Sequence, residues 1–273
     1  MKKITTRLIM LLVFTAFTMV SCKQQQSNSK EKVETNKQVV DKSTLESITL
    51  EKLQGSPAYE NAVLQMDTPK TSKISESGEV NFAFTVHNYD LKAQTGSSNS
   101  QLLANSDKGQ HIHFILNNEP YSAHYEPTFE KGIPDGVHHL VAFLSRSYHE
   151  SVKNENSVVV QKLEVGADAR DTYELDMEAP TLIYSRPKGT YTGKDTENLL
   201  LDFFVLNTTL SENGNKVRAT INDKEFIITE WAPQIIKGLP KGEVTIQLAL
   251  IDAKGNLIPG MFNEVTRTIT LKE

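Results

Sequence analysis

The chain has 273 residues and a single cysteine, and its 29 basic and 34 acidic side chains give a formal net charge of −5. This balance offers no basic field for nucleic acid, so we expect no nucleic-acid partner. One cysteine excludes an intramolecular disulfide and any metal site built from several cysteines. The stability of the protein must therefore come from ordinary apolar cores.

The N-terminus has the layout of a secretory signal peptide. Three basic residues precede an apolar run over residues 8–20, which is too short for a comfortable membrane span. Cys22 follows this run, and residues 19–22 resemble a lipobox in which Met19 replaces the usual leucine. We predict a signal peptide at 1–21 and a lipid on Cys22. This lipid would anchor the protein in the cell envelope, with the outer membrane expected and the leaflet left open. The alternative is an ordinary signal peptide that leaves a free thiol.

Residues 22–44 have the composition of a flexible tether. They consist mostly of Gln, Ser, Asn, Lys and Glu, with few large apolar side chains. Such a segment buries too little apolar surface to offset its ordering entropy. We expect it to be disordered and to link the lipid to the first folded domain.

From about residue 45 the sequence shows short runs that are typical of strands. Apolar and polar side chains alternate over 81–86, 111–116, 137–144 and 157–163. Clusters of Gly, Pro, Asn and Asp separate these runs. Many short strands with turn signals between them indicate an all-β sandwich or barrel.

The second half of this region repeats the order of elements in the first. Four pairs of segments match: 64–70 with 182–188, 82–88 with 201–207, 113–121 with 218–226, and 132–136 with 238–242. Each copy has the size of an immunoglobulin-like sandwich. We therefore predict two tandem immunoglobulin-like β-sandwich domains, at 45–172 and 173–273.

All seven histidines lie in the first predicted domain. Side chains of a strand alternate between the two faces of its sheet. By comparison with the second copy, the apolar residues of 111–116 face the core, so His111 and His113 should face outward. The same comparison turns His139 outward and His138 inward on the later strand.

An immunoglobulin-like order makes these two strands neighbours in one sheet, so His111, His113 and His139 should share its outer face. His149 follows in the next loop and is expected to bend back over that face. Imidazole is a common ligand of zinc and copper, and three histidines with an open position suit either metal. We predict a zinc or copper site on these three histidines, with His149 as a fourth ligand. The alternative is that they are ordinary solvent-facing strand residues.

The loop over residues 145–151 is a second candidate site. It contains Arg146 and Tyr148, and exposed loops of this composition at a sandwich end commonly carry binding. An arginine pairs readily with a carboxylate or a phosphate. We predict a binding loop around these two residues for a protein or glycan partner, and the alternative is an ordinary polar loop.

Recognisable catalytic motifs are missing from the sequence. It has no nucleophile elbow, Walker loop, HExxH pair or Rossmann glycine pattern. We therefore expect a binding or scaffold protein with a metal site rather than an enzyme. The alternatives are a metal-free protein- or glycan-interaction module and, less favoured, a metal-dependent activity.

The run HIHFILNNEPYSAHY, followed by GVHHLVAFLSRSYHES, resembles a motif of uncharacterised envelope lipoproteins of Bacteroidetes-type bacteria. That motif reads approximately HxHxxxDNxPY, then GxHxLxxFxSRxxHESxK, and Asn117 stands here where the family has aspartate. The resemblance covers part of the first domain and implies secretion and a β-rich fold. Some members carry the label phosphopeptide-binding protein, for which only Arg146 offers support in this sequence. The recurring positions that match are His111, His113, His139, Arg146 and His149.

Overall fold

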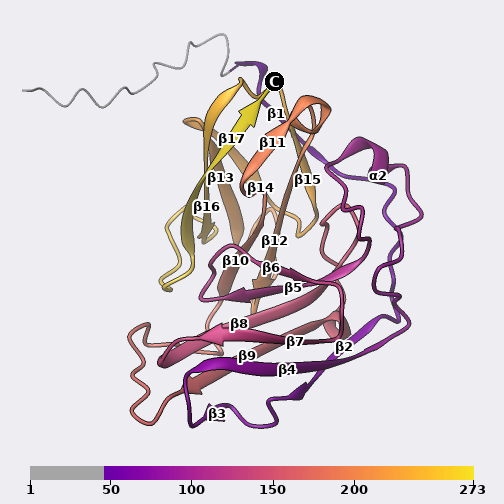
Figure 1. The fold of residues 1–273 in the computed structure, drawn as a ribbon. Coiled ribbons are helices and arrows are strands. Elements are labelled where there is room, and N and C mark those ends of the chain that lie inside the picture. Colours follow the sequence, from indigo (N-terminus) through magenta and orange to yellow (C-terminus); the bar gives the residue numbers. More distant parts are fainter. Residues whose placement is uncertain (1–45) are drawn as a thin grey trace, which may run out of the picture. The chain divides into compact units, whose positions relative to one another are not determined.

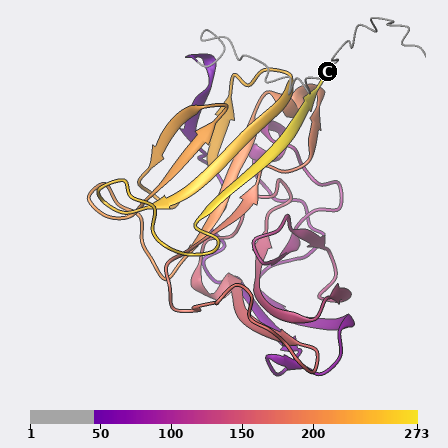
Figure 2. The same cartoon turned by 90° about the vertical axis from the view of Figure 1, so that its left-hand side faces the viewer.

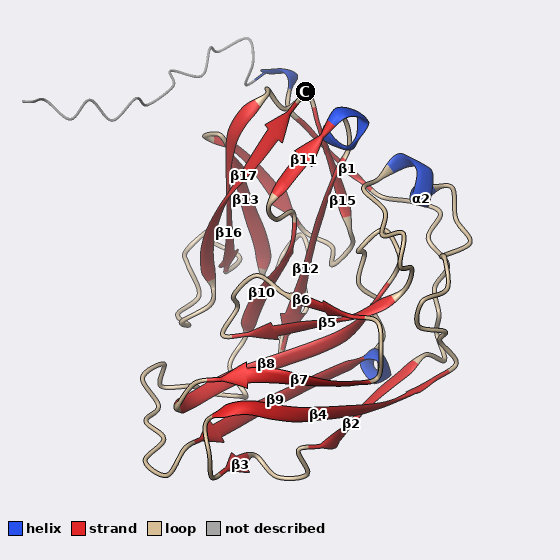
Figure 3. Cartoon of the chain, viewed as in Figure 1, coloured by secondary structure: helices blue, strands red, loops and turns tan. Residues whose placement is uncertain are grey.

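The computed structural model describes residues 46–273, so the predicted signal peptide, the lipidated Cys22 and the tether lie outside the described residues. Strands account for nearly all regular structure in this range (Figure 3). The helical segments that have assigned bounds are single turns, namely α2 (Asn99–Leu102), η1 (Glu155–Ser157) and η2 (Gly193–Thr196). The fold is all-β, as the alternating runs predict. None of the helices among these residues has the length and apolar character needed to span a membrane.

The first sandwich consists of two sheets (Figure 1). Its three-stranded sheet contains, in order, β2 (Val63–Thr68), β4 (Gly78–His87) and β7 (Thr128–Ile133). Its five-stranded sheet contains, in order, β3 (Lys73–Ile74), β9 (Val158–Val165), β8 (Gly136–Ser145), β5 (His111–Leu116) and β6 (Ser122–His124).

The second sandwich has a corresponding pair of sheets. The first contains, in order, β1 (Thr49–Lys52), β15 (Gln234–Lys237), β12 (Leu199–Leu206) and β10 (Thr181–Arg186). The second contains, in order, β11 (Thr190–Thr192), β17 (Glu264–Lys272), β16 (Gly242–Ile251), β13 (Lys216–Ile221) and β14 (Lys224–Ile228). Figure 2 shows the long antiparallel strands of this sheet side by side, in orange and yellow.

The two sandwiches share one topology, which is immunoglobulin-like. In the first sandwich β3 pairs in parallel with the last strand, β9, and in the second β11 pairs in parallel with the last strand, β17. The main ladders of both sandwiches are antiparallel. The strand orders β3-β9-β8-β5-β6 and β11-β17-β16-β13-β14 correspond element by element. The repeat seen in the sequence is therefore a repeat of the fold.

The alternation in the sequence assigns the core-facing side chains correctly. In the first sandwich the buried core includes the apolar residues of β5 and β8 that were expected to face inward, namely Ile112, Phe114, Leu140, Ala142 and Leu144. In the second sandwich the corresponding residues are Val217, Ala219, Ile221, Val244, Ile246, Leu248 and Leu250. Both cores are formed between the two sheets of their sandwich.

The first described strand, β1, belongs to the second sandwich, although residues 45–172 were predicted to form the first domain. Leu50 of β1 pairs with Ile236 of β15, and Ile48 is fully buried in the second core. The first sandwich begins only with β2. A short edge strand carries no signal that identifies which sheet it will extend, so the sequence pattern missed this crossing.

The outer face of the five-stranded sheet is covered at β5 and β8 rather than exposed to solvent. Val141 and Phe143 of β8 pack in one buried cluster with Ile183 and Phe204 of the second sandwich. Strands buried on both faces carry apolar residues on both faces, and β8 shows this pattern. The expectation of solvent-facing histidines on this sheet was therefore wrong.

Candidate metal centre

Three of the predicted histidines meet in one group. His111 and His113 lie two residues apart on β5, so their side chains project from the same face of the sheet. His149 reaches them from the turn that follows β8. Each of the three offers one ring nitrogen, and these nitrogens all lie within 4.8 Å of one another.

The spacing of the nitrogens suits one metal ion. His111 Nε2 lies 2.9 Å from His113 Nε2 and 3.2 Å from His149 Nδ1. Nitrogens bound to zinc at about 2.0–2.1 Å in a tetrahedron lie about 3.3 Å apart. These two separations are close to that value, the third pair lies within 4.8 Å, and a three-histidine set leaves a further coordination position open.

The hydrogen bond on the far side of the His111 ring fixes how its two nitrogens are protonated. His111 Nδ1 lies 2.8 Å from the carbonyl oxygen of Gly109, so it must carry the proton and donate. In the neutral imidazole, His111 Nε2 is then a free lone pair. His113 Nδ1 lies 3.2 Å from the hydroxyl of Ser185, which is able to accept or to donate. This outer contact lets His113 present its Nε2 as a lone pair to a metal, an arrangement common behind metal-bound histidines.

All three imidazoles favour the neutral form that binds metals. Burial, together with the positive charges of Arg186 and Lys188, lowers the pKa of His111 to about 4. Burial also holds the pKa of His113 and of His149 well below the usual range, and neighbouring histidines and the same two cations act in the same direction.

His149 is held in place by a tight turn. The Arg146 N–H donates to the Glu150 carbonyl at 2.8 Å, and the His149 N–H donates to the Arg146 carbonyl at 2.9 Å. Ser145 and Ser151 form a β-bridge across the turn. His149 has a φ of 69°, in the left-handed region that a non-glycine residue seldom adopts. That conformation costs roughly 1 kcal/mol and persists only where the surroundings enforce it.

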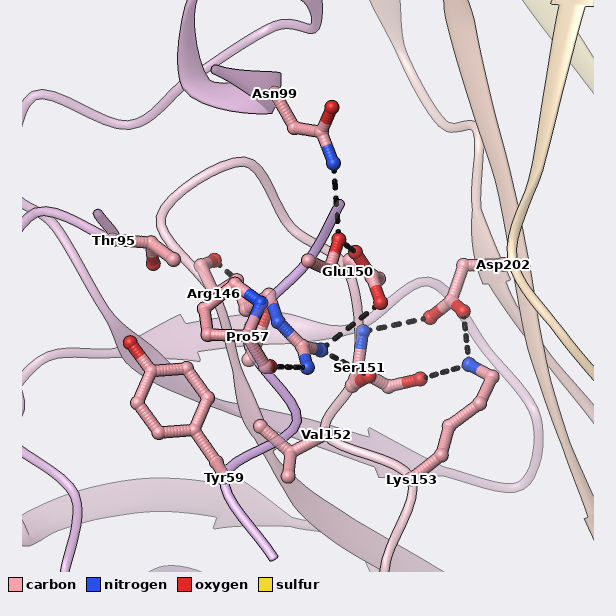
Figure 4. A network of polar contacts seen from close by, with 12 residues as sticks. Pro57, Tyr59, Thr95, Asn99, Arg146, Glu150, Ser151, Val152, Lys153 and Asp202 are labelled. Atoms are coloured by element: carbon pink, nitrogen blue, oxygen red, sulfur yellow. Dashed lines mark hydrogen bonds and ion pairs between the residues drawn. The ribbon is translucent and has the colours of Figure 1, made fainter. Parts of the chain in front are cut away.

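Buried ion pairs hold the turn in the conformation that gives His149 its positive φ (Figure 4). Arg146 Nη1 lies 3.1 Å from the Glu150 carboxylate and 2.8 Å from the carbonyl oxygen of Ser151. Lys153 pairs with Asp202 of β12, and the same carboxylate accepts the Ser151 N–H at 3.1 Å. Asp202 belongs to the second sandwich, so the turn that carries His149 is fastened to both sandwiches.

The predicted binding loop around Arg146 and Tyr148 is not an exposed loop. Arg146 is 3% exposed and Tyr148 is fully buried. The guanidinium is used by the internal contacts described above, and the Tyr148 hydroxyl donates to Ser56 at 2.9 Å. The Tyr148 ring packs in a small apolar cluster with Leu53, Leu103, Leu200 and Ile235. These two residues shape the turn, and the prediction that they form an accessible recognition surface was wrong.

The structure does not bring His139 to the other three. His113 pairs across the ladder with Phe143, whereas His139 lies four residues away along β8, about 13 Å at the strand rise. Its ring stacks on Phe262 of the second sandwich with centroids 5.6 Å apart. The face was predicted correctly, but alternation alone does not determine which residues of two strands stand opposite each other.

The remaining histidines lie apart from this centre. His138 is buried and bonds to the Asn117 side chain and to the carbonyl oxygen of Pro134, as an inward-facing residue should. His124 stacks on Phe129 with centroids 3.4 Å apart, and burial lowers its pKa to about 4.

Four further residues close the centre, and none of them was among the predicted site residues. The Tyr121 ring stacks on His113 with centroids 3.5 Å apart, and its hydroxyl lies 3.2 Å from His149 Nδ1. Lys188 Nζ lies 3.8 Å from the centroid of the Tyr121 ring and donates to the Tyr121 carbonyl at 2.7 Å. Arg186 lies over the same ring at 5.3 Å. The fourth is Ser185, which contacts His113.

Tyr121 had a signal in the sequence, because it is the tyrosine of the NNEPY run within the matched motif. The segment from Ser185 to Lys188 had none, because it belongs to the second copy. It reaches the histidines only through the docking of the two sandwiches. The centre is thus built on the first sandwich and completed by the second.

Comparisons with known proteins assign the chain to no family. No family model matches the chain, and no curated protein matches it. Solved structures that resemble it include the fibronectin(III)-like modules of Clostridium thermocellum CbhA, at 14% identity and a TM-score of 0.27, covering 77% of this chain and 94% of that one. The central fibronectin-III array of RIM-binding protein matches at 11% identity and a TM-score of 0.24, covering 78% and 69%.

A third similar structure is the Bacteroides ovatus SGBP-B of a mixed-linkage glucan utilization locus, in complex with a heptasaccharide. It has 10% identity and a TM-score of 0.22 and covers 76% of this chain and 70% of that one. At identities and scores this low, these likenesses say nothing about what this chain binds.

Proposed function

We propose that this protein is an envelope-anchored metal-binding protein that holds one zinc or copper ion on His111, His113 and His149. The observation that carries the proposal is the convergence of three ring nitrogens within 4.8 Å of one another, from two buried histidines and the partly buried His149. Their lowered pKa values support it, because a proton does not compete with the metal at neutral pH.

The chemistry of the ligands restricts the metal. An all-imidazole set suits Zn²⁺ or Cu²⁺, whereas calcium and magnesium need oxygen ligands and Cu(I) favours sulfur. The single cysteine, Cys22, lies outside the described residues and is assigned to the lipid anchor. A buried site with an ordered second layer also suits retention of a metal better than rapid exchange with solvent.

The proposal is tested by metal analysis of the purified protein, followed by zinc and copper titration after treatment with a chelator. We expect one metal ion per chain. A variant with both His111→Ala and His113→Ala should lose at least 100-fold in affinity, because two of the three ligands are gone.

The matched control is His139→Ala. His139 is also buried on the same face of the sheet, but it stands outside the group, and its Nδ1 has no hydrogen-bond partner among the described residues. This variant should keep the full stoichiometry. If the wild type takes up no zinc or copper at micromolar concentrations, the metal-binding function is wrong and a metal-free interaction module replaces it.

A further inference from the structure

Arg186 is a buried cation without a counter-ion among the described residues. It is 8% exposed, and none of their carboxylates forms an ion pair with it. Its Nη1 donates to the Tyr191 hydroxyl at 2.8 Å, while its Nε has no hydrogen-bond partner in this part of the chain. Burying a guanidinium in this way is costly unless a negative charge compensates it.

A second cation stands beside it. Lys188 is half-buried, and burial together with Arg186 lowers its pKa to about 8. It donates a hydrogen bond to the Tyr121 carbonyl, and none of the ion pairs among the described residues involves it. The field around the three histidines is therefore positive before any metal is present.

A small cavity lies beside Arg186 and His149, one of the three ligand histidines. It is lined by both His149 and Arg186, together with Ala104, Tyr148, Tyr191, Asn198 and Leu200. Its volume is about 10 Å³, which is the room needed for one water-sized group. The space next to the ligand His149 thus faces a guanidinium with a free donor.

A divalent ion on the three histidines would add two positive charges to this field. A metal with three imidazole ligands also keeps an open coordination position. We infer that the centre binds its metal together with one small monovalent anion, which contacts the metal at the open position and accepts a hydrogen bond from Arg186. This inference rests on the proposed metal-binding function.

The size of the cavity sets the class of anion. Fluoride is close to water in size and has the single charge required, whereas azide, formate and phosphate are all larger than this space. The anion should strengthen metal binding, and the metal should strengthen anion binding by the same factor, because the two equilibria are linked.

The test uses protein loaded with cobalt(II), whose visible bands report a change in coordination. Titration with fluoride should perturb these bands, and phosphate at equal ionic strength should not. Arg186→Gln should weaken fluoride binding at least ten-fold while still binding one cobalt ion. Arg186→Lys keeps the positive charge, so its anion affinity should lie between those of the wild type and Arg186→Gln. Arg218→Gln serves as the control, because this partly exposed arginine lies on β13 of the second sandwich and pairs with Glu225.

Each outcome decides a separate claim. Fluoride binding that is equal in wild type and in a folded, metal-loaded Arg186→Gln protein would overturn the inference and leave metal binding intact. The inference is also overturned, with metal binding intact, if the metal-loaded wild type responds to no anion. This result is expected if the Tyr121 hydroxyl fills the open coordination position. Failure of the wild type to bind cobalt, zinc or copper would overturn the proposed function itself, and this is read from the stoichiometry in the same experiment.

Discussion

The Tyr121 ring lies flat on the His113 ring, with centroids 3.5 Å apart and an angle of 13° between the planes. Lys188 Nζ lies 3.8 Å from the centroid of the same tyrosine ring. Because both neighbours are so close, they must occupy opposite faces of the phenol. Tyr121 is therefore the layer that separates a ligand imidazole from a cation of the second sandwich.

This layer predicts different results for two substitutions of Tyr121. Tyr121→Ala removes a ring that is 3% exposed and leaves a cavity, so the free energy of unfolding should fall by roughly 3–5 kcal/mol. Metal affinity should fall at least ten-fold, because His113 loses its support. Tyr121→Phe keeps the ring and should change metal affinity less than three-fold. Urea unfolding and zinc titration measure the two quantities, and equal effects of the two variants would show that the hydroxyl, not the ring, matters.

Stability of the metal-free protein should depend on pH through the buried histidines. The folded-state pKa of His111 is lowered to about 4, whereas an unfolded histidine titrates near 6.5. The unfolded chain therefore binds more protons between these values. The stabilisation is complete above pH 6.5 and is lost as the pH falls toward 4. For His111 alone the difference is on the order of 3 kcal/mol.

Urea unfolding in the presence of a chelator, at pH 7.5, 6 and 5, measures this dependence. His113→Phe, which removes one of the buried imidazoles and keeps a ring of similar size, should reduce the loss of stability on acidification. His87→Ala removes an exposed histidine of the same sandwich and should leave the profile unchanged. A variant profile identical to that of the wild type would contradict the lowered pKa values of the centre.

Much of the fold follows from local patterns in the sequence. Alternation of residues such as Ile112 and Phe114 assigns the core faces of β5 and β8, and the internal repeat gives two copies of one sandwich. The pairing of β1 with β15 does not follow, because it joins segments that are far apart in the chain and depends on the docking of the two sandwiches.

The candidate centre could be predicted only in part, because only some of its features are local in the sequence. His111 and His113 share a face by alternation, and this is a local property. The exclusion of His139 depends on cross-strand register. The burial of the centre, and the roles of Arg186 and Lys188, depend on which surface of the second sandwich covers the first. A single sequence specifies neither of these by pattern.

The ion pair between Arg146 and Glu150 should be required for the turn that carries His149. Both side chains are buried, so Glu150→Ala leaves an unpaired guanidinium and should cost roughly 3–5 kcal/mol of unfolding free energy. Metal affinity should fall with it, because the left-handed turn loses its support. Glu230→Ala breaks an exposed pair with Lys52 and should cost less than about 1 kcal/mol. A loss from Glu150→Ala as small as the loss from this control would contradict the account of the turn.

The predicted lipid anchor has a direct test in cells. Cys22→Ser should move the protein from the membrane fraction to the soluble fraction, because fatty-acyl chains supply the membrane affinity at about 0.8 kcal/mol per buried methylene group. Incorporation of a labelled fatty acid should be lost in the same variant. A wild-type protein that is soluble and unlabelled would support the ordinary signal peptide instead.

The central claim is that one metal ion lies among His111 Nε2, His113 Nε2 and His149 Nδ1. Anomalous diffraction from crystals of the zinc- or copper-loaded protein tests it most directly. We predict a single anomalous peak about 2 Å from each of the three nitrogens. A peak at another histidine, such as His139 or the exposed His87, or the lack of any peak in crystals grown with saturating metal, would contradict the account.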